Sequence, residues 1–71
     1  MTALDLRGIA AAGGSIILNA QEYTALDLRG IASAGKESGA TLMIKGASKL
    51  TALDCRGIAN CNPGNVTFDF A

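Results

Sequence analysis

The chain has 71 residues, of which 49% are hydrophobic and 17% are charged, and its six basic residues balance its six acidic ones. One small domain fits this length, and the apolar content argues against a disordered chain. The charge balance argues against a nucleic-acid-binding protein, because such proteins carry a basic excess. The apolar runs are too short to span a membrane, and no charged segment precedes one as in a signal peptide.

A nine-residue segment occurs three times along the chain. Residues 2–10 and 24–32 both read TALDLRGIA, and residues 51–59 read TALDCRGIA. The intervals between successive starts lie within the range of about 20–50 residues that is typical of solenoid repeats. Each copy is followed by a glycine-containing joint and a short apolar run. The sequence therefore predicts a single domain of three tandem repeats, at residues 1–22, 23–49 and 50–71.

The TALD segment of each copy has the features of a helix start. In the second copy, Thr24 is placed to cap the helix, and Asp27 three residues later completes a capping box. An apolar stripe at helical spacing follows, made of Ala25, Leu28, Ile31, Ala32 and Gly35. Gly39, and the Asn62-Pro63-Gly64 turn of the third copy, are expected to end their helices.

A glycine inside each expected helix costs about 1 kcal/mol relative to alanine. These glycines are Gly8, Gly30 and Gly57. Their recurrence predicts that each helix lies close to the sheet or to a neighbouring helix at this position.

The apolar runs at residues 15–20, 40–45 and 65–70 are predicted strands, because their residues alternate in character. One face is apolar: Ile16, Leu18, Ala20, Leu42, Ile44, Val66, Phe68 and Phe70. The opposite face is mixed: Ile17, Asn19, Met43, Lys45, Thr67 and Asp69. A parallel sheet covered on both faces would be apolar throughout, so we expect helices on one face only.

The order helix–strand, three times over, predicts an α/β fold. Right-handed crossovers between parallel strands place all helices on the same side of the sheet. We therefore expect a short α/β solenoid with a three-stranded parallel sheet in sequential order.

Two other registers remain open at this stage. The spacing Leu50-x-x-Leu53-x-Cys55 resembles the leucine-rich repeat pattern, and this resemblance implies that the TALD segments are strands. The stretch GGSIILNA resembles repeats of filamentous secreted adhesins, which implies a β-solenoid fragment of such an adhesin.

Cys55 and Cys61 are six residues apart, so on a helix their side chains point to different faces and are badly placed for a disulfide or a shared metal. Cys55 occupies the position of Leu6 and Leu28, so we expect a small buried core residue. Two free thiols agree with a reducing compartment, and we expect the cytoplasm.

Arginine and aspartate recur in every copy, at Arg7, Arg29 and Arg56 and at Asp5, Asp27 and Asp54. We expect the aspartates to cap helices and the arginines to form a solvated row or to pair with a neighbouring copy. The alternative is a charged ladder that binds an acidic or phosphorylated partner.

The segment before the third helix offers a candidate anion site. Ser48, Lys49 and Thr51 lie where helix amides and the helix dipole favour an anion. The sequence lacks the phosphate-loop pattern, which argues against a nucleotide site. The alternative function is a small regulatory domain that binds a phosphate-type ligand at the helix N-termini. With no histidine, no activated nucleophile and no carboxylate pair, we expect no catalytic residue, no metal, no cofactor and no enzymatic activity.

The two outer repeats carry no polar cap, although solenoids normally protect their terminal repeats. Both outer strands would leave backbone groups unpaired at the sheet edges, which favours pairing with another chain. The sequence therefore predicts a structural protein-interaction module that forms a homodimer or higher oligomer by edge pairing or through the mixed sheet face. The candidate interface residues are Ile17, Met43, Thr67 and Phe70. We expect the partner to be the chain itself or another protein, with no nucleic acid and no membrane.

Overall fold

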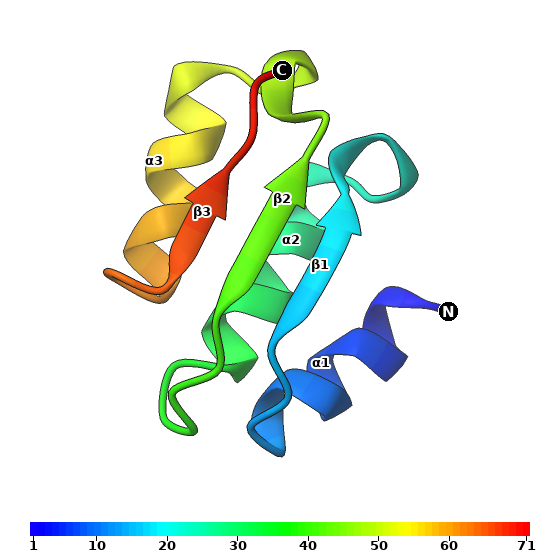
Figure 1. Ribbon diagram of the computed structural model, residues 1–71, viewed down its shortest axis with the longest axis vertical. Helices are drawn as coiled ribbons and strands as arrows, with labels where there is room; N and C mark the ends of the chain where they lie inside the picture. The colour runs from blue at the N-terminus through cyan, green and yellow to red at the C-terminus, as the bar shows by residue number, and fades with distance from the viewer.

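The computed structural model describes all 71 residues as an α/β fold with an open, three-stranded parallel sheet of order β1-β2-β3. Figure 1 shows the helices on one side of this sheet. The helices are α1 (Ala3–Ala11), α2 (Ala25–Ala34) and α3 (Ala52–Cys61), and the strands are β1 (Ile16–Asn19), β2 (Leu42–Lys45) and β3 (Val66–Phe68). Two short 3-10 helices, η1 (Ala20–Glu22) and η2 (Ala47–Lys49), lead from strands to the next helix. They were not predicted.

The capping boxes decide the register of each copy. In α2 the hydroxyl of Thr24 accepts a hydrogen bond from the Asp27 N–H, and the Asp27 carboxylate accepts one from the Thr24 N–H. The first and third copies make the same pair of bonds. The predicted helix starts are therefore confirmed. The leucine-rich register and the β-solenoid are wrong, because both need extended TALD segments.

Helix α2 ends earlier than predicted. Its last helical residue is Ala34 and its C-cap is Gly35, whereas Gly39 closes the turn that follows, with φ of 79°. The position of a Cβ atom on Gly35 lies 3.0 Å from the Cβ of Ala40. The chain turns back closely enough at this point that Gly35 suits the end of the helix better than a larger residue.

The strands pair in register and bury alternate residues. Ile16 pairs with Leu42, and Leu42 with Val66, on the face that the helices cover. Residues of these strands and of the inner faces of the helices form the core. Its largest fully buried apolar side chains are Leu28, Ile31, Ile44 and Ile58. The prediction that Phe70 lies on the covered face of the strand is wrong: β3 ends at Phe68, and Phe70 is 57% exposed, because the chain leaves the sheet before it.

Two side chains link neighbouring helix–strand units through hydrogen bonds near the C-terminal ends of the helices. The Ser38 hydroxyl donates to the carbonyl of Ala10 at 2.7 Å, joining the second copy to the first. The amide of Asn62, which is 2% exposed, donates to the carbonyl of Ala40 at 3.0 Å, joining the third copy to the second. The two bonds thus link the turn after α2 to α1, and the end of α3 to the segment before β2.

Candidate interaction surface

Three of the four predicted interface residues lie on the sheet face without helices. Ile17, Met43 and Thr67 are register partners on β1, β2 and β3, so their side chains form one row across the sheet. Ile17 is 68% exposed and Met43 is 36% exposed. A shallow depression of about 280 Å³ includes all three residues in its lining. This row is the centre of the uncovered face.

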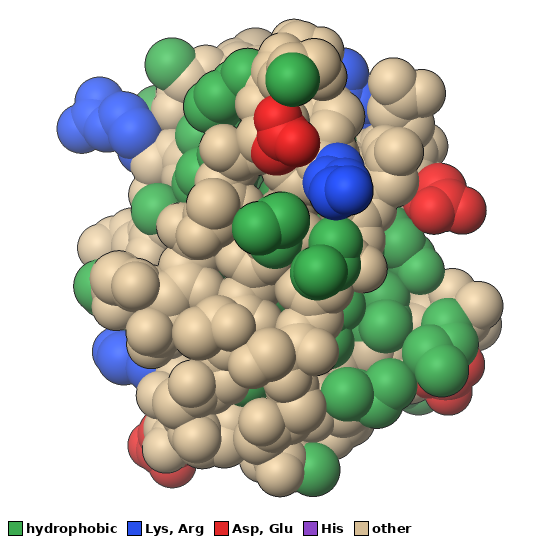
Figure 2. All heavy atoms as spheres, viewed as in Figure 1, with side chains coloured by type: hydrophobic (Ala, Val, Ile, Leu, Met, Phe, Trp, Pro, Cys, Tyr) green, Lys and Arg blue, Asp and Glu red, His purple; other side chains and the backbone are tan.

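Charged groups lie beside this row. Lys45 pairs with Asn19 on β1, and Asp69 follows Phe68, the partner of Ile44, so Asp69 comes opposite Lys45. Figure 2 shows this side of the molecule, with hydrophobic side chains in patches and acidic and basic groups close together near one end. The face thus combines two neighbouring exposed apolar side chains, Ile17 and Met43, with a basic and an acidic group at one end.

Phe70 lies beyond the sheet rather than in the row. Its ring stacks on that of Phe68, with ring centroids 6.1 Å apart. Phe68 is half-buried on the face that the helices cover, beside Ile44, whereas Phe70 is exposed past the end of β3.

The groups of the predicted anion site are already engaged by the protein. The Lys49 ammonium donates to the carbonyl of Tyr23 at 3.2 Å, and the Thr51 hydroxyl accepts from the N–H of Asp54. The Asp54 carboxylate occupies the start of α3, where it accepts from the Thr51 N–H. Ser48 is exposed. The structure holds Lys49 against Tyr23, just before α2, and anion binding at this position stays a prediction.

The two cysteines are free and half-buried, so the expectation of a fully buried core thiol at Cys55 is too strong. The corresponding residues Leu6 and Leu28 are buried. Partial burial, together with the neighbouring Asp54 carboxylate, raises the pKa of the Cys55 thiol. This thiol is therefore held in its protonated, less nucleophilic form.

Sequence reasoning missed a contact between arginine and glycine on the outer helix layer. The side chain of Arg7 lies over Gly30, with its Cδ 3.5 Å from the position of a Cβ atom, and Arg29 lies over Gly57. Gly8 has no such neighbour. The prediction that these glycines allow close approach is confirmed for Gly57, where Arg29 would clash with a Cβ atom. At Gly30 the contact with Arg7 has ordinary length, and at Gly8 the prediction is wrong.

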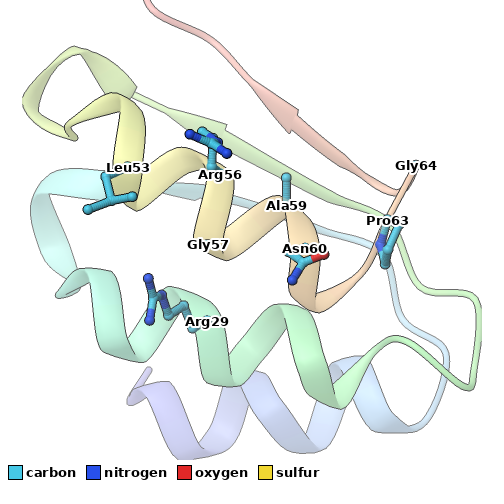
Figure 3. A pocket seen from close by; sticks show the side chains of 8 residues that line it. All are labelled: Arg29, Leu53, Arg56, Gly57, Ala59, Asn60, Pro63 and Gly64. Atoms are coloured by element: carbon cyan, nitrogen blue, oxygen red, sulfur yellow. The ribbon is translucent and has the colours of Figure 1, made fainter.

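A shallow groove of about 670 Å³ lies on this layer, and Arg29, Arg56 and Gly57 are part of its lining. Figure 3 shows Arg29 reaching from α2 toward α3, while Arg56 points to the opposite side of α3. The arginines therefore lean in one direction across the helix layer, rather than forming an evenly solvated row.

Three equivalent leucines also lie on the outer layer, and the sequence analysis assigned them no role. Leu4, Leu26 and Leu53 are 74%, 77% and 71% exposed. Each falls outside the buried stripe of its helix, a position that helical spacing alone indicates. They add an apolar row to the side of the molecule opposite the open sheet face.

No group of three or more histidine, cysteine, aspartate or glutamate residues in the chain has the geometry to hold a metal ion. None of the helices has the length and apolar character needed to cross a lipid bilayer. Comparison of the chain with protein-family models, with curated proteins and with solved structures gave no match.

Proposed function

We propose that the chain is a short α/β solenoid of three helix–strand repeats, and that it serves as a non-enzymatic structural module that self-associates into a homo-oligomer. The observation that carries this proposal is the open sheet face, where Ile17 and Met43 are 68% and 36% exposed in register. Apolar side chains gathered on one face and bordered by polar groups mark a protein-interaction surface.

The outer strands support the same proposal. β1 and β3 each pair with β2 alone, so one edge of each strand carries unpaired backbone groups. Such edges are templates for pairing with another strand. Because both edges belong to parallel strands of nearly equal length, a second copy of the chain offers a matching partner.

A stable interface has to cover a large fraction of the surface of so small a chain. A stable interface of standard size covers about 800 Å² per partner, which is about a fifth of the 4140 Å² surface of this chain. The row of Ile17, Met43 and Thr67 is therefore the centre of a larger contact, not its full extent. A contact this large has to occupy most of one side of the molecule.

Light scattering coupled to size exclusion, over a range of chain concentrations, tests the proposal. The wild-type chain is expected to show a mass above that of one chain, and the mass should rise with concentration. Ile17→Lys lowers the mass if the sheet face is the contact, whereas Ser33→Lys is the matched control, because Ser33 is an exposed residue of α2. A single-chain mass at every concentration would contradict the proposal.

The two free thiols also bear on location. Unpaired cysteines fit a reducing compartment better than an oxidising one, so we place the module in the cytoplasm as part of this proposal. Labelling of both thiols in freshly lysed cells tests this point, since an extracellular chain would show oxidised cysteines.

A further inference from the structure

The three equivalent isoleucines of the repeated segment are unequally covered. Ile31 and Ile58 are fully buried, whereas Ile9 is 37% exposed. Helix α2 packs against α1, and α3 packs against α2, so only α1 has no helix before it. This isoleucine is therefore the residue that each helix presents to the preceding helix. At α1 that surface is open.

The equivalent alanines show the opposite pattern. Ala10 and Ala32 are 3% and 1% exposed, whereas Ala59 is half-buried. The first two lie on helices that have a following helix, and Ala59 lies on α3, which has none. This alanine faces the following helix, so the open surface of α3 is complementary to the open surface of α1.

The arginines repeat this direction. Arg7 lies over Gly30 of the next helix and Arg29 lies over Gly57, while Arg56 points to the side of α3 where no further helix follows (Figure 3). At the other end of the molecule, the space over Gly8 is open within 4 Å of a Cβ position. One end thus carries an arginine without a glycine, and the other carries a glycine without an arginine.

We propose that a second copy of this chain docks end to end, so that α3 of one copy lies beside α1 of the next. Ile9 of the second copy is then buried against Ala59 of the first, and Arg56 crosses over Gly8. β3 comes beside β1 in the parallel arrangement that β1 and β2 already have. This inference rests on the proposed self-association and adds to the sheet face a second contact, which continues the two helix–helix interfaces inside the chain.

The symmetry of the contact follows from its two different surfaces. Two unlike surfaces make a heterologous interface, which leaves one free surface at each end of every assembly. Chains that associate in this way form an open series of oligomers or a ring, whereas twofold pairing of sheet faces or of like edges ends at a dimer.

Mixing of two blocked variants tests the contact, with all chains carrying Ile17→Lys to disable the sheet face. Gly8→Arg blocks the α1 surface by its bulk and by charge repulsion of Arg56 of the neighbouring chain. The variant is expected to fold, because the space over Gly8 is open. Ala59→Arg blocks the α3 surface. The control is Leu26→Arg, which adds the same charge on an exposed residue of α2. Circular dichroism verifies that each variant is folded, and Ile9→Lys and Arg56→Asp serve as second blocking variants.

Sedimentation velocity then separates the outcomes. We expect the Ile17→Lys parent and the Leu26→Arg control to form a concentration-dependent series. Each blocked variant alone should be monomeric, and an equimolar mixture of the two should give a one-to-one dimer. A blocked variant that still associates alone, or a mixture that stays monomeric, overturns the end-to-end contact. If the parent is monomeric but the wild-type chain associates, the end-to-end contact falls and the proposed function stands; if the wild-type chain is also monomeric, both fall.

Discussion

The guanidinium of Arg29 lies over the backbone of Gly57, with its Cζ 2.7 Å from the position that a Cβ atom would take. The two residues lie on neighbouring helices, and the same pair of positions meets at Arg7 and Gly30. At Gly57, a residue that lowers helix propensity thus leaves room for a long side chain that crosses the helix. In both pairs the arginine contacts the helix that follows its own in the chain.

Alanine substitutions at the three glycines should separate helix propensity from this contact. Gly8→Ala is expected to raise the free energy of unfolding by up to about 1 kcal/mol, because it improves a helix and meets no neighbour. Gly57→Ala should gain less, because Arg29 has to move. Urea unfolding of dilute chain measures both, with Gly30→Ala as a control that meets Arg7 only at ordinary contact distance. Equal gains at Gly8 and Gly57 would show that Arg29 does not hold this position in solution.

Isoleucines at the same position of the repeated segment should differ in their contribution to stability. Ile31 is fully buried and Ile9 is 37% exposed. Ile31→Ala is expected to lower the free energy of unfolding by about 2–5 kcal/mol, the usual cost of truncating a buried aliphatic residue, and Ile9→Ala should cost clearly less. Thermal or urea unfolding of dilute, monomeric chain checks the ranking, and Ile58→Ala should resemble Ile31→Ala. Equal losses at Ile9 and Ile31 would contradict the difference in burial.

Asn62 joins the last two copies through a buried hydrogen bond. Its side-chain amide donates to the carbonyl of Ala40, and its side-chain oxygen accepts from the Asn65 amide. Asn62→Ala is expected to cost about 1–3 kcal/mol, because the Ala40 carbonyl loses its side-chain donor. Asn60→Ala, an exposed substitution on the same helix, is the control. Unfolding curves that are the same for both variants would show that the bond does not contribute.

Much of the fold follows from local signals in the sequence. The capping boxes at Thr24 and its equivalents begin the helices because they satisfy backbone groups within four residues. The alternation from Ile16 to Asn19 places each strand residue on a face, so the exposed row containing Ile17 and Met43 was predictable. These features need no knowledge of distant residues.

The remaining features depend on contacts between copies. Nothing near Asn62 in the sequence indicates that its amide meets Ala40, and Arg29 meets Gly57 only after the helices have packed. Cys55 occupies the place of Leu28 but is half-buried, whereas Leu28 and Leu6 are buried. Equivalent positions of a repeated sequence thus differ in burial. That Arg7 and Arg29 each contact the following helix is visible only in three dimensions.

The first capping box should respond to acid in a defined direction. The N–H and the hydroxyl of Thr2 hydrogen-bond Asp5 and lower the pKa of its carboxyl from the ordinary value of 3.8. A lowered folded-state pKa stabilises the fold above the unfolded value, and this contribution is lost as the pH falls through the folded value. Carboxyl-carbon NMR shifts should therefore give an Asp5 midpoint below 3.8, and the stability difference from Asp5→Asn should shrink in acid. A midpoint equal to that of the urea-unfolded chain would exclude the bond in solution.

The thiol of Cys55 should react slowly for a physical reason that the fold supplies. Burial, and then the charge of Asp54, raise the pKa of the Cys55 thiol above 9.0, so little thiolate is present at neutral pH. In a Cys61→Ala background, iodoacetamide should alkylate Cys55 more slowly than a free cysteine derivative, with a rate midpoint above pH 9.0. Because the folded state keeps the proton longer, folding stability should fall as the pH rises from the unfolded pKa toward the folded one. Urea should restore the rate of a free thiol, and a folded chain that already reacts at that rate would show that Cys55 is neither buried nor influenced by Asp54.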